Sequence, residues 1–80
     1  MLNINFSKKE LTHLKAKGYY VEQEKDIITV RNIKGKAVGE MIYREDSNLI
    51  ILMTRTQVIG VKVLMEYMNI LDMYMSMLDH

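Results

Sequence analysis

Few side chains in this sequence could carry out catalysis or hold a metal ion. Cysteine is absent, and the two histidines are His13, in a predicted helix, and His80, the last residue. Nucleophilic catalysis needs a nucleophile beside a base that activates it, and a metal site needs several convergent ligands. The sequence shows neither combination. We therefore expect no catalytic residue, no metal ligand and no cofactor, and we expect that the chain is not an enzyme.

A group of basic residues is the first candidate for binding a macromolecule. They crowd the segment before Tyr19 and Tyr20 and continue into the strands that follow. Cations beside aromatic rings can contact a nucleic-acid backbone and stack on its bases. The net charge is only +1, however, and specific nucleic-acid-binding domains usually concentrate more positive charge. Nucleic-acid binding is therefore the alternative function. The candidate residues are Lys8, Lys9, Lys15, Lys17, Arg31 and Lys34.

The C-terminal segment is the second candidate, because its apolar residues exceed what one helix needs. From Val61 they recur at helical spacing in two adjacent stripes. A helix on a sheet needs one apolar stripe about 100° wide. Either both stripes are buried within one chain, or one of them contacts another chain. The first stripe is Val61, Leu64, Met68, Leu71, Met75 and Leu78, and the second is Val63, Tyr67, Ile70, Tyr74 and Met77. The candidate contact residues are Tyr67, Met68, Tyr74 and Met75.

The run 49–54 is a third candidate, since both of its faces are apolar. Leu49, Ile51 and Met53 alternate with Ile50 and Leu52. In a four-stranded meander this run would form an edge, and an apolar edge strand tends to pair with another chain unless it is covered. We therefore add Ile50 and Leu52 to the candidate partner-binding residues.

The elements that must position these residues follow from caps, turns and periodicity. Ser7 and Glu10 form a capping box, and Gly18 can end the helix predicted over 8–17. Strand-like runs occupy 19–23, 27–33, 37–44 and 49–54, and a helix is predicted from residue 61 onward. Short connections favour an antiparallel meander. We predict an α+β fold: a short N-terminal helix, three to four strands, and a long C-terminal helix packed on the sheet.

This order of elements resembles that of small phage and mobile-element proteins of the anti-CRISPR type. The resemblance is carried by the opening Met1-Leu2-Asn3-Ile4-Asn5, the capped helix, the Gly18-Tyr19-Tyr20-Val21 entry to the meander and the closing helix. It rests on architecture rather than on a diagnostic motif, so no functional residue is carried over. The resemblance implies a protein that binds and modulates a host factor.

Length and composition complete the expectations. Eighty residues make one domain, spanning 1–80, and no signal peptide or membrane-length apolar run is visible. We expect a cytoplasmic protein that does not bind membranes. The predicted function is a protein-interaction module, dimeric through its last helix or its edge strand.

Overall fold

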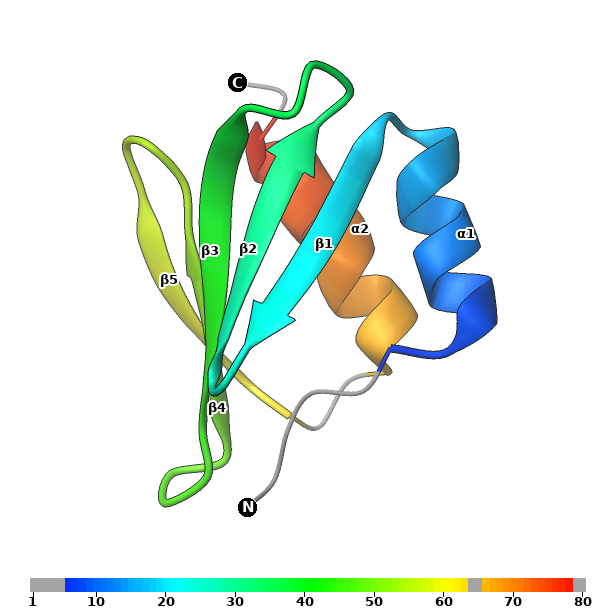
Figure 1. Ribbon diagram of the computed structural model, residues 1–80. Helices are drawn as coiled ribbons and strands as arrows, with labels where there is room; N and C mark the ends of the chain where they lie inside the picture. Colours follow the sequence, from blue (N-terminus) through cyan, green and yellow to red (C-terminus); the bar gives the residue numbers. More distant parts are fainter. Residues whose placement is uncertain (1–5, 64–65, 79–80) are drawn as a thin grey trace.

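The computed structural model describes residues 6–63 and 66–78, which form two helices and one antiparallel sheet (Figure 1). The strands pair in sequence order, β1-β2-β3-β4-β5. Helix α2 crosses one face of this sheet, and α1 lies beside it at the β1 end. The fold is α+β, as predicted, with five strands instead of three to four. The elements are α1 (Lys8–Ala16), β1 (Tyr19–Glu24), β2 (Ile27–Asn32), β3 (Ala37–Arg44), β4 (Leu49–Met53), β5 (Val58–Lys62) and α2 (Tyr67–Leu78).

The first helix begins and ends where its capping residues predict. The Ser7 hydroxyl accepts from the Glu10 amide at 3.2 Å, and the Glu10 carboxylate accepts from the Ser7 amide at 2.7 Å. Gly18 has a φ of +87°, the left-handed conformation that glycine adopts at little cost after a helix. Leu14 of this helix is buried, whereas Leu11 is substantially exposed.

The prediction of a helix from residue 61 is wrong at its start. Residues Val58–Lys62 form β5, which pairs with β4 in an antiparallel ladder, and the helix begins only at Tyr67. Val58, Ile59 and Val61 are β-branched, a composition that favours strands. The apolar residues from Val61 onward also have helical spacing, so the sequence pattern favoured a helix over this strand. Leu64, assigned to the first stripe, lies outside the described residues, as do Met1–Asn5 and His80.

The core lies between the sheet and the helices. One face of β2, β3 and β4 meets residues from both predicted stripes of α2, so the surplus of apolar residues is used within the chain. Because β5 covers the free side of β4, β4 is an inner strand rather than an edge. The buried apolar residues are Leu14, Ile28, Val30, Met41, Ile50, Leu52, Ile70, Leu71, Tyr74 and Met75.

Tyr74 is fully buried and fits against the sheet at a glycine. Its hydroxyl donates to the Met53 carbonyl at 2.6 Å. A Cβ added at Gly39 would lie 2.0 Å from the Tyr74 oxygen and 2.5 Å from the Met53 oxygen. Only a residue without a side chain can therefore occupy this position. Burial, and secondarily the Glu40 carboxylate, raise the pKa of the Tyr74 phenol, because both disfavour the phenolate.

Candidate protein-interaction surface

Four of the six predicted partner-binding residues are not on the surface. Ile50, Leu52, Tyr74 and Met75 are buried in the core, so their assignment to a partner surface is corrected. The physical reason is that α2 packs on the sheet through both predicted stripes, and β4 is an inner strand. A side chain that is already buried within its own chain has no area left for a partner.

The other two, Tyr67 and Met68, are half-buried at the start of α2. The Tyr67 ring meets the Phe6 ring edge to face, with centroids 5.9 Å apart and planes at 84°. Tyr67 therefore helps to fix the segment that leads into α1. Part of the apolar surface of Tyr67 is therefore buried against its own chain.

An apolar surface does exist, on the sheet face opposite α2. Among the described elements, no helix covers this face, which points toward the viewer in Figure 1. Cross-strand partners share a face, and the pairs Ile27↔Ile42, Ile42↔Ile51 and Ile51↔Gly60 make a continuous row. We call this face the outer face and its three isoleucines the isoleucine row.

A second row widens the apolar area. Thr29 pairs with Glu40, Glu40 with Met53, and Met53 with Val58. Met53 and Val58 thus lie next to Ile51 on the same face. Ile27 is 41% exposed and Val58 69%, whereas Ile42, Ile51 and Met53 are half-buried. Apolar side chains standing beside one another on an uncovered sheet face are typical of contact surfaces.

The outer face is also hollowed along one side. A shallow pocket lies over β3, β4 and the β4–β5 turn. Val58 and Met53 form part of its apolar lining, and Glu40 and Arg55 supply opposite charges. The pocket is lined by Thr29, Ala37, Val38, Gly39, Glu40, Met53, Thr54, Arg55 and Val58.

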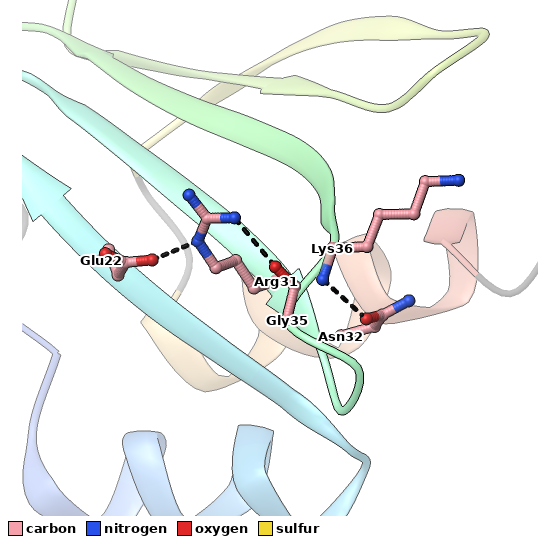
Figure 2. Close-up of polar contacts among 5 residues, drawn as sticks. All are labelled: Glu22, Arg31, Asn32, Gly35 and Lys36. Atoms are coloured by element: carbon pink, nitrogen blue, oxygen red, sulfur yellow. Dashed lines mark hydrogen bonds and ion pairs between the residues drawn. The ribbon is translucent and has the colours of Figure 1, made fainter.

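Charged side chains surround the apolar part. Figure 2 shows Arg31 of β2 between the Glu22 carboxylate of β1 and the Gly35 carbonyl. Its Nη1 donates to the Gly35 oxygen at 2.9 Å, and its Nε donates to Glu22. In the same turn the Asn32 side chain accepts from the Lys36 amide at 3.0 Å. Arg31 is therefore engaged in holding this hairpin.

The structure does not bring the six predicted basic residues to one place. Lys17 follows α1 at the end of the molecule that carries the β2–β3 turn with Lys34 (Figure 1). Lys8 and Lys9 lie in the first turn of α1, at its opposite end, and Arg31 is paired with Glu22. Four side chains thus gather toward one end, Lys15, Lys17, Arg31 and Lys34.

His13 has a partner that the sequence did not indicate. Its Nε2 lies 2.6 Å from the Asp72 carboxylate of α2, 59 positions away. Both side chains are partly exposed, so this pair links α1 to α2 but contributes little to stability. No spacing rule connects two residues so far apart in sequence.

The described part of the chain holds neither a metal-binding cluster nor a membrane-spanning helix. Residues 6–63 and 66–78 contain no group of three or more histidine, aspartate or glutamate side chains placed to hold a metal ion. Within the same ranges, no helix has the length and apolar character needed to cross a membrane.

Comparison with known proteins finds no match to this chain. No protein-family model, no curated protein and no solved structure matches the chain.

Proposed function

We propose that this protein is a small interaction module that binds a partner protein through its outer face. The observation that supports the proposal is the isoleucine row, Ile27, Ile42 and Ile51, together with Met53 and Val58 on an uncovered sheet face. Burying apolar surface drives most protein association, at roughly 25 cal/mol per Å² before the costs of binding. The resemblance to anti-CRISPR-type proteins extends this proposal to a host factor as the partner.

The rim of the surface fits a protein better than it fits a nucleic acid. Glu22, Glu24 and Glu40 share the outer face with the apolar rows, as their strand positions and partners require. A phosphate backbone is repelled by carboxylates, whereas a protein partner can place arginine or lysine beside them. Arg44 and Lys62, the last residues of β3 and β5, add positive charge to the same rim.

The test compares the same isoleucine-to-lysine substitution at two positions, one on the outer face and one in a turn. Ile51→Lys places a charge in the centre of the isoleucine row, whereas Ile33→Lys changes a residue that is 76% exposed in the β2–β3 turn. The tagged chain and both variants are incubated with host lysate, with and without nuclease. Captured proteins are identified by mass spectrometry, and circular dichroism checks that each variant is folded.

We expect a discrete protein to be captured by the unmodified chain and by Ile33→Lys, but not by Ile51→Lys, regardless of nuclease. Equal capture by folded Ile51→Lys and Ile33→Lys would exclude the outer face as the binding surface. Capture that disappears after nuclease treatment would instead support the nucleic-acid alternative, through Lys15, Lys17 and Lys34.

A further inference from the structure

Strand β5 presents a second surface, which is an edge rather than a face. It is the last strand of the sheet, and among the described elements nothing pairs with its far side. At the opposite edge, α1 lies beside β1 (Figure 1). Edge strands are commonly protected from pairing by proline, bulges or charge. The run Val58-Ile59-Gly60-Val61 has none of these, and its one charged residue, Lys62, stands at the end.

The hydrogen bonds at both ends of the β4–β5 hairpin show which backbone groups of β5 point away from β4. The Thr54 amide donates to the Gln57 carbonyl at 2.9 Å, and the Val63 amide donates to the Asn48 carbonyl at 3.0 Å. In an antiparallel ladder, hydrogen-bonded and non-hydrogen-bonded pairs alternate. Ile59 and Val61 therefore direct their backbone groups toward β4. Val58, Gly60 and Lys62 direct theirs outward.

We propose that β5 pairs with β5 of a second copy of this chain, antiparallel about a two-fold axis at Gly60. In this register Gly60 faces Gly60 of the partner subunit, and both exchange backbone hydrogen bonds. Val58 of each copy lies opposite Lys62 of the other. On the helix side of the sheet, Ile59 of each copy lies opposite Val61 of the other. A β-branched pair of this kind is a favourable cross-strand contact.

The distribution of charge favours this antiparallel arrangement of two copies. In a meander, successive turns alternate between the two ends of the sheet. Lys34, Lys36 and Arg55 lie in or next to the turns at one end. The other end carries Glu45 and Asp46 in the β3–β4 turn, together with Arg44, which pairs with Asp46, and Lys62 at the end of β5. Antiparallel pairing about Gly60 brings the basic turns of each copy toward the carboxylates of the β3–β4 turn of the other. Two parallel copies would instead place the basic turns together.

This dimer does not depend on the proposed partner protein, but it enlarges the surface that such a partner would meet. Gly60 ends the isoleucine row, because it pairs with Ile51. Across the two-fold axis the row of one copy continues into the row of the other, on a single ten-stranded sheet. The contact is a five-residue strand. We therefore expect weak association, in the range of small transient interfaces.

The test uses the full chain and four variants in sedimentation equilibrium up to about 1 mM protein, where weak dimers become populated. Val58→Glu places an opposite charge across from Lys62 of the partner subunit, twice per dimer, and Val58→Lys places a like charge there. Val58 is largely exposed, so both variants can fold. Gly60→Pro removes an outward amide and leaves the bonds to β4 intact, whereas Gly60→Ala keeps that amide.

We expect a monomer–dimer equilibrium that Val58→Glu tightens and Val58→Lys weakens, with roughly tenfold between the two variants at low salt. Gly60→Pro should be monomeric and Gly60→Ala should still dimerise. A chain that stays monomeric throughout the range overturns the proposal. If Val58→Glu and Val58→Lys change dimerisation equally, the proposed pairing of Val58 with Lys62 of the partner subunit is wrong. If a folded Gly60→Pro dimerises normally, β5 is not the strand through which the two copies pair. If Gly60→Pro does not fold, the two Val58 variants decide.

Discussion

The contact between Gly39 and Tyr74 predicts a large effect from adding a single methyl group. In Gly39→Ala the new Cβ would lie 2.0 Å from the Tyr74 hydroxyl oxygen, whereas contacts below 3.0 Å essentially never occur. It would also lie 2.5 Å from the Met53 carbonyl oxygen, which is backbone and cannot rotate away. Tyr74 is fully buried, so its ring cannot withdraw without displacing the residues packed around it.

Two costs determine the expected magnitude. Overpacking a filled core costs about 1–3 kcal/mol. Displacing the Tyr74 hydroxyl from the Met53 carbonyl leaves a buried polar group without its hydrogen bond, which costs a further ~1–3 kcal/mol. Reduced freedom of the unfolded chain offsets about 0.4–1 kcal/mol of this. We expect Gly39→Ala to lower the free energy of unfolding by about 2–5 kcal/mol, a large fraction of the total for a domain of 80 residues.

Gly60→Ala is the matched control, because the same substitution in another strand meets almost nothing. Its Cβ would approach only Leu49 Cδ1, at 4.0 Å. We expect it to leave the free energy of unfolding unchanged or to raise it by up to about 1 kcal/mol. Urea titrations followed by circular dichroism, at a protein concentration that keeps the chain monomeric, measure both changes. The double variant Gly39→Ala/Tyr74→Phe should recover part of the loss, since it removes the closer clash but not the one with Met53. Equal stability of Gly39→Ala and Gly60→Ala would refute the described packing of Tyr74 on Gly39.

Two further predictions concern the same phenol and the first helix cap. Because the pKa of Tyr74 is raised in the folded state, the unfolded chain releases a proton above about pH 10 that the folded chain keeps. Stability should therefore fall with rising pH in that range, by up to about 1.4 kcal/mol per pH unit from this group. The lysines titrate there too, so the measurement is the difference between the unmodified chain and Tyr74→Phe in urea titrations at pH 9 to 11; parallel curves would contradict it. Ser7→Ala removes the hydroxyl that accepts from the Glu10 amide and should cost about 1 kcal/mol, whereas Ser47→Ala, in an exposed turn, should cost less than half of that. Thermal unfolding compares the two serine variants, and equal losses would show that the cap contributes nothing specific.

The sequence alone determined the local elements of this protein. The Ser7–Glu10 capping box and Gly18 lie within a few positions of the groups they serve, and the structure confirms the helix that they delimit and the four predicted strands. Such features depend on backbone conformation and on hydrogen bonds between neighbours. The α+β class followed from their order.

Only the tertiary structure decided which apolar residues face the core and which remain exposed. Leu49 to Met53 is apolar on both faces, and Val61 fits a helix and a strand equally well, so periodicity alone could not assign them. Once β5 pairs with β4, Ile50 and Leu52 turn inward and Ile51 joins the outer face. The surface that we propose for binding consists of residues from four strands, brought into one row by register. Register is a relation between distant segments, and for that reason a pattern within any one of them does not contain it.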